Sequence, residues 1–190
     1  MSKWNESPAI RINDFVTASL RAEGIIPPLN QYVTQTNNQS PQQLPFMIPA
    51  AQIPELETMY NNGFVELPYC VYTISHRTEK DAPWCYKGQT TWHFYSSDTD
   101  KLIEIENYVN DLCKREDWSA ADCNDYFSKN DPTNPFNFQC ITFLTSVGPA
   151  STDDEGGRYM SLVIIRHDST YEGTGRVGVE PFSGGLGMIH

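Results

Sequence analysis

The 190-residue sequence has no long apolar run. A membrane-spanning helix needs about 20 mostly apolar residues in a row, and no segment approaches that length. The first residues, M-S-K-W-N-E-S, also have no apolar stretch after a basic start, so the sequence predicts neither a signal peptide nor a membrane span. The two N-x-S/T matches, at Asn5 and Asn38, therefore predict no glycosylation.

Positive charge is also scarce, with 13 Lys and Arg against 24 Asp and Glu and a formal net charge of −11. A surface this acidic repels DNA phosphates, which excludes a protein that wraps nucleic acid tightly. Two interpretations stay open. The charge keeps the protein soluble, or it forms a wall past which DNA slides without sticking.

Cysteine occurs at five positions, an odd number without C-x-x-C spacing. These are Cys70, Cys85, Cys113, Cys123 and Cys140. Zinc ligands normally come in closely spaced pairs, so the sequence predicts no zinc site. Several of these cysteines fall within apolar periods, which predicts reduced and mostly buried thiols, as in a protein made in cytoplasm.

The sequence predicts no nucleotide-binding site, although its C-terminal segment matches the dinucleotide-binding fingerprint G-x-G-x-x-G at Gly173, Gly175 and Gly178. That fingerprint requires a helix after the loop and an acidic residue about 20 positions further on. Only 12 residues follow Gly178, and they include Pro181 and three more glycines. We expect no nucleotide or other cofactor there.

The sequence also lacks a catalytic signature. His93 lies among strand aromatics, and His167 ends a strand beside Asp168. No nucleophile motif accompanies them, which favours ordinary strand-edge histidines over a catalytic pair. Asp98 and Asp100 suit a helix N-terminus, and the acidic segment at 153–155 lacks the spacing of a calcium loop. We expect no catalytic residue and no metal.

The hydrophobic periods predict an α+β fold: a four-stranded, mainly antiparallel sheet with an amphipathic helix packed on one face. The expected strands are 69–74, 90–95, 136–145 and 158–167, and the first two are expected to form a hairpin or meander. The expected helices are 8–23 (or a shorter one from Asn13), one from about 98 to 115 with its apolar face at 102–112, and 119–127, which begins with a capping-box-like S-A-A-D.

The chain divides into four segments of different composition. We expect an N-terminal helix at 1–24, a Pro-rich extended arm at 25–66, an α+β core at 67–170 and a Gly-rich tail at 171–190. Apolar but irregular segments pack against a neighbour, so we expect inter-subunit contacts at Phe46, Ile48, Ile53, Trp84, Val179, Phe182 and Leu186. The acidic loop that faces a lumen or partner is predicted at Asp153, Asp154 and Glu155.

Six segments carry a resemblance to a known family. They are I-N-D-F-V-T-A-S-L-R-A (12–22), I-P-A-A-Q-I-P-E-L (48–56), L-P-Y-C-V-Y-T-I (67–74), W-H-F-Y-S-S-D-T-D-K-L-I-E-I (92–105), D-W-S-A-A-D-C-N-D-Y-F (117–127) and E-G-G-R-Y-M-S-L-V-I-I-R (155–166). Together they resemble tail terminator (tail completion) proteins of tailed bacteriophages, particularly those of contractile-tailed cyanobacterial phages. The resemblance spans about 12–170.

The resemblance implies a virion protein, made in the host cytoplasm, that forms a six-membered ring. Such a ring caps the tail tube and possibly the sheath, stops tube growth and joins the tail to the head-neck connector, with DNA only as passing cargo. It implies no enzyme activity and no cofactor. Two alternatives stay open: another neck or head-completion ring protein, and a small ligand-binding or hydrolytic α+β domain.

Overall fold

The computed structural model describes residues 7–27, 33–34, 42–43, 46–52, 68–80, 82–114, 116–152 and 157–171. The elements are α1 (Pro8–Ala22), β1 (Val33–Thr34), β2 (Gln42–Gln43), β3 (Met47–Pro49), the 3-10 turn η3 (Ala50–Gln52), β4 (Tyr69–Glu79), β5 (Ala82–Ser96), α3 (Thr99–Cys113), α4 (Glu116–Asn130), β6 (Phe136–Ser151) and β7 (Tyr159–Tyr171).

The main sheet has five strands in the order β3-β4-β5-β7-β6. The last four are the four predicted strands, and each pairs antiparallel with its neighbour. The fifth, β3, pairs parallel with β4 and places Met47 opposite Cys70. The α+β class is therefore confirmed, and the four-stranded sheet is corrected to five. The reason is that residues 47–49, expected in the extended arm, have their backbone paired with an edge strand.

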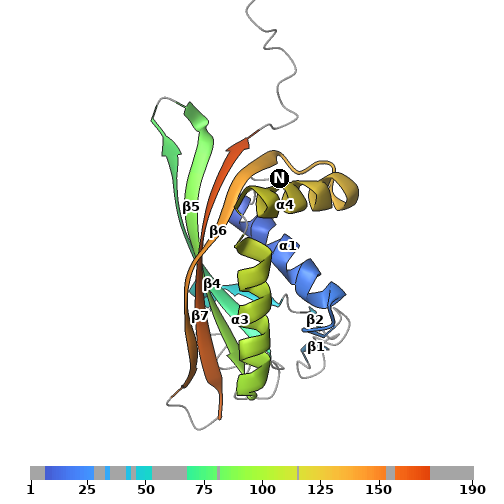
Figure 1. Ribbon diagram of the computed structural model, residues 1–190, viewed down its shortest axis with the longest axis vertical. Coiled ribbons are helices and arrows are strands. Elements are labelled where there is room, and N and C mark those ends of the chain that lie inside the picture. Colours follow the sequence, from blue (N-terminus) through green and yellow to red (C-terminus); the bar gives the residue numbers. More distant parts are fainter. Residues whose placement is uncertain are drawn as a thin grey trace, which may run out of the picture.

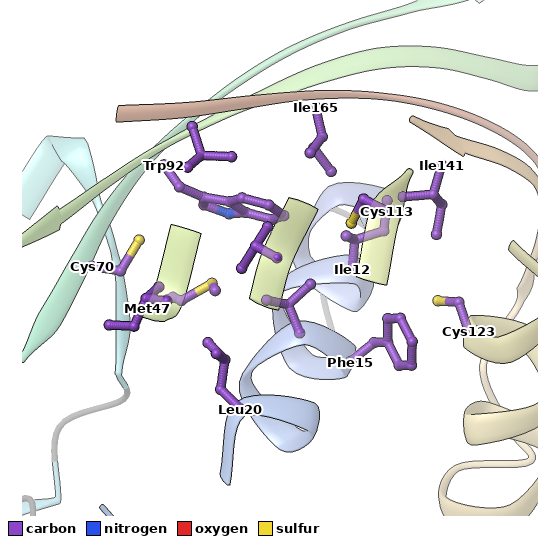
Figure 2. Close-up of a cluster of buried hydrophobic side chains, with 14 of the residues drawn as sticks. Ile12, Phe15, Leu20, Met47, Cys70, Trp92, Cys113, Cys123, Ile141 and Ile165 are labelled. Carbon is purple, nitrogen blue, oxygen red and sulfur yellow. The ribbon is translucent and has the colours of Figure 1, made fainter. Parts of the chain in front are cut away.

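The three helices α1, α3 and α4 lie on the same side of the main sheet (Figure 1). Strand residues alternate between the two faces, and β5 buries Thr90, Trp92 and Phe94 toward the helices. Figure 2 shows sheet residues such as Trp92 and Ile165 pointing into the same core as Ile12 of α1. One hydrophobic core thus sits between the sheet and a single helical layer.

The first helix starts at Pro8, so the longer of the two predicted versions is confirmed. Ser7 is its N-cap in extended conformation and Pro8 opens the first turn. The chain leaves the helix near Gly24, which has a φ of 71° that favours glycine. Ile12 and Leu20 are fully buried in the common core, so α1 belongs to the α+β unit and is no separate appendage.

Helix α3 follows the predicted period. Leu102, Ile105 and Val109 are fully buried on one face, and the side chain of Asp98 accepts a hydrogen bond from the backbone N–H of Asp100 (2.9 Å). This is the expected N-terminal arrangement, in which a carboxylate satisfies a free helix donor.

Helix α4 differs from its prediction, because it begins at Glu116 instead of Ser119. Ser119 is buried inside the helix, so the S-A-A-D stretch is no capping box. Trp118 is 68% exposed whereas Cys123 is fully buried, so the two side chains form no hydrophobic staple. The predicted start fails because α3 ends at Cys113 and α4 already begins at Glu116.

The strands extend well beyond their predicted ends. Lys87 and Gly88, which lie between the predicted strands 69–74 and 90–95, are inside β5, and the pairing of β4 with β5 continues to Glu79 opposite Ala82. Gly148 and Pro149, expected in a loop, lie inside β6 where the pairing with β7 shifts. β6 is an edge strand, so a proline there is tolerated without loss of an inner ladder bond.

Candidate interaction surface

The side of the main sheet that faces away from the helices carries a mixed surface. Its residues lie on β4, β5, β6 and β7, out of phase with buried Trp92 and Val163; Tyr69 and Val71 share this phase but are themselves buried. We call it the outer sheet face and define it by Thr73, Ser75, Arg77, Lys87, Gln89, Thr91, His93, Val147, Leu162, Ile164, Arg166 and Asp168. No described helix lies on this side (Figure 1).

One part of the outer sheet face is apolar. Val147 of β6 is 60% exposed and pairs with half-buried Leu162 of β7. Half-buried Ile164 continues the stripe along β7, and Leu144, near the same stretch of β6, is 47% exposed. Apolar side chains that gather on a surface mark an interaction site more often than single ones do.

The adjoining part is basic, although the chain is acidic. Arg77, Lys87 and Arg166 line a shallow hollow of about 440 Å³ together with Ser75, Gly88, Gln89 and Asp168. All three basic side chains are exposed. The hollow therefore gathers three cations and one carboxylate on a protein whose net charge is −11. The sequence does not reveal this cluster, because the predicted strands leave residues 75–89 in a connection and do not show which strand lies beside Arg166.

The part of the helical layer formed by α3 and α4 is acidic, in contrast to the basic hollow on the sheet. Residues 98–131 contain ten carboxylates against four basic side chains, which gives a formal charge of −6. Along α3, Asp100, Glu104 and Asp111 are exposed and recur at a spacing that places them on one helix face. We call these three residues the acidic stripe. Ile103 beside it is 45% exposed.

A second groove, of about 530 Å³, lies between α1, β3, β4 and α4. Arg11 and Asp131 form an ion pair across it (2.9 Å). Burial raises the pKa of Asp14 in its wall, whereas hydrogen bonds from Thr133 lower the pKa of Asp131. The Arg11–Asp131 pair ties α1 to the residue that follows α4, and no described Ser, Cys or His lines this groove.

The predicted contact residues differ in exposure. Phe46 and Ile48 are only 1% and 3% exposed, so the hypothesis that they contact another subunit is wrong. Phe46 belongs to the core cluster, where its ring stacks on Phe94 at 6.2 Å, and Ile48 lies in β3 opposite buried Val71. Trp84 is 44% exposed, and its contact with another subunit stays a prediction. The predicted contacts Ile53, Val179, Phe182 and Leu186 and the acidic loop Asp153, Asp154 and Glu155 lie outside the described residues.

The two strand histidines lie on opposite faces of the sheet. His167 is fully buried on the helix side, next to Gly88. His93 is half-buried on the outer sheet face, and burial lowers its pKa. Neither lines either of the two hollows described above. Among the described residues, no group of three or more His, Cys, Asp or Glu could hold a metal ion.

The cysteines give a first testable prediction. Cys70, Cys113 and Cys123 are fully buried, and burial raises the pKa of each thiol, to about 12 for Cys113. Since the thiolate is the reactive form, iodoacetamide should label the folded protein only at half-buried Cys85 and Cys140. Intact mass spectrometry should show at most two adducts at neutral pH and five after denaturation. Fast labelling of Cys113 in the folded protein would contradict the buried core.

Within the described residues, no helix combines the length and the apolar character needed to cross a membrane. Comparison with known proteins adds no family. No protein-family model matches the sequence, and no curated protein matches it.

Proposed function

We propose that the protein is a virion structural protein, a tail terminator that forms a ring on the end of a phage tail tube. The ring stops growth of the tube and joins it to the head-neck connector, and the sheath is a further contact. The proposal combines the family resemblance of about 12–170 with one structural observation. That observation is the outer sheet face, which no described helix covers.

A sheet covered by helices on one face suits a ring subunit. A closed ring of identical chains needs a heterologous interface, in which two different surfaces of the same molecule meet. The outer sheet face and the helical layer are two such surfaces on opposite sides of one chain. The net charge of −11 also suits a ring through which DNA passes without adhering.

Another neck or head-completion ring protein is the second candidate, because the same surfaces would serve it. A helical adaptor fits less well, since five strands build the main layer here. A small hydrolytic domain would need a nucleophile and a base within hydrogen-bond reach, and His93 and His167 point to opposite faces of the sheet.

The test is capping of tail tubes by the purified full-length protein. Tubes assembled from the tube protein of the same phage are mixed with it and viewed by electron microscopy. We expect density on one end of each tube and no further elongation when fresh tube protein is added. Tubes without the protein, which keep growing, are the control. Tubes that elongate equally with and without it would contradict the proposal.

A further inference from the structure

We infer that the outer sheet face of one copy docks on the acidic stripe of a second copy, head to tail. The inference deepens the proposed ring function and rests on it. It assigns both halves of the interface to described residues: Arg77, Lys87 and Arg166 on the sheet, and Asp100, Glu104 and Asp111 on α3.

The strand register brings the three basic residues together. Arg77 of β4 lies directly opposite Lys87 of β5, and Arg166 of β7 lies opposite Gln89, two residues further along β5. Side chains of directly opposed residues are about 5 Å apart, so the three cations form one patch, which also contains Asp168 directly opposite Lys87. The hollow of about 440 Å³ between them gives an approaching carboxylate room to reach more than one cation.

The acidic side sits on a regular helix. Glu104 and Asp111 form exposed ion pairs with Lys101 and Lys114, each 2.5 Å long. Exposed pairs of this kind contribute about 0–1 kcal/mol, so they exchange readily for a denser set of cations on a partner. Asp100 lies in the first turn of α3.

The two surfaces cannot meet within one molecule. Helix α3 packs its buried side on the sheet, so its exposed acidic stripe faces away from the outer sheet face (Figure 1). Complementary patches on opposite sides of one chain generate a head-to-tail series of copies, which closes into a ring when the rotation between copies permits it.

Apolar side chains accompany the charges on both sides. Val147 and Leu144 of β6, the strand beside β7, are 60% and 47% exposed, and Ile103 and Trp118 of the helical layer are 45% and 68% exposed. Protein interfaces combine an apolar centre with a polar rim, and tryptophan is frequent among the side chains that contribute most. Both surfaces therefore offer apolar side chains besides their charges.

DNA is the other polymer that a basic patch attracts. The observations favour a second copy, because three cations are few for duplex binding and the chain as a whole repels phosphate. Binding of DNA is kept as an outcome of the test.

The test is a charge-swap series in the full-length protein. The sheet variant carries Arg77→Glu and Arg166→Glu, the helix variant carries Glu104→Lys and Asp111→Lys, and the swap variant carries all four changes. The control, Lys129→Glu, reverses one charge at an exposed position of α4 that belongs to neither patch. Sedimentation velocity gives the dissociation constant, and circular dichroism verifies that each variant is folded.

We expect the sheet and helix variants each to raise the dissociation constant at least about tenfold, because each places like charges opposite one another. The swap variant should recover most of the association, and the control should associate as the native chain does. Sheet and helix variants that associate normally would overturn the inference, as would a folded swap variant that shows no recovery. The inference is also overturned if the sheet variant loses only affinity for a 30-base-pair duplex.

The capping assay separates this inference from the proposed function. If the sheet and helix variants still form rings and cap tubes, the assigned interface is wrong and the tail-terminator role stands. If ring formation responds to the charge swap but the rings never cap tubes, the assigned interface stands and the tail-terminator role is wrong.

Discussion

Replacing Trp92 by alanine is expected to lower the free energy of unfolding by about 3–5 kcal/mol. Trp92 is fully buried between the sheet and α1 (Figure 2), and its indole N–H donates a hydrogen bond to the side-chain oxygen of buried Asn13 (2.7 Å). The substitution removes a large side chain from the core and leaves that acceptor unpaired. Since domains are stable by only about 5–15 kcal/mol, the variant should be close to unfolding at 37 °C.

Urea denaturation followed by far-ultraviolet circular dichroism measures this loss without depending on tryptophan fluorescence. Trp84→Ala in the same strand is the matched control, because Trp84 is 44% exposed and its loss should cost far less. Trp92→Phe keeps most of the packing and removes the donor, so it should fall between the native chain and Trp92→Ala. Equal losses for Trp84→Ala and Trp92→Ala would contradict the described core.

Replacing Gly88 by alanine is expected to destabilise the fold by about 1–3 kcal/mol through overpacking. A Cβ at this position would lie 2.6 Å from Nε2 of His167 and closer still to its Cε1 atom. His167 is fully buried and sits directly opposite Gly88 on β7, so its ring has no room to withdraw. The strands β5 and β7 would have to move apart at the centre of the sheet.

Gly148→Ala on the edge strand is the matched control, because no atom lies within 4 Å of a Cβ added there. It should change the free energy of unfolding by no more than about 0.5 kcal/mol. The double variant Gly88→Ala with His167→Ala should be more stable than the sum of the two single losses, since the second change removes the obstructing ring. Purely additive losses would show that the two residues do not touch.

The elements predictable from sequence are those in which local signals and tertiary packing agree. Helix α3 has a clear apolar period and an acidic start, and its buried face is the predicted one. Helix α1 combines a serine-proline start with a glycine stop and appears with the longer of its predicted bounds. Both patterns depend on side-chain spacing and capping within a few residues, which a single sequence displays.

The errors come from interactions between distant residues. Residues 47–49 have no strand period of their own, and their pairing with β4 turns part of the expected arm into an edge strand. Ser119 carries a local capping signal that the direct passage from α3 to α4 overrides. Lys87 and Gly88 look like turn residues, yet the glycine serves a close approach to His167 across the sheet.

The candidate interaction surface could not be predicted either, because it also depends on residues that are distant in sequence. Arg77, Lys87 and Arg166 are far apart in sequence and come together only through the strand register. The sequence predicted an assembly subunit from irregular apolar segments, but two of its chosen contacts, Phe46 and Ile48, are buried in the chain itself. Reading an interface required knowing which side of each strand the helices leave uncovered.

The most direct test of the account is the mass of the purified full-length protein, measured by native mass spectrometry at several concentrations and in the presence of tail tubes. The account predicts one closed species at an integral multiple of 21.6 kDa, which sediments with tubes and weakens as salt screens the charged interface. A protein that stays at 21.6 kDa at every concentration and leaves tubes uncapped would contradict it.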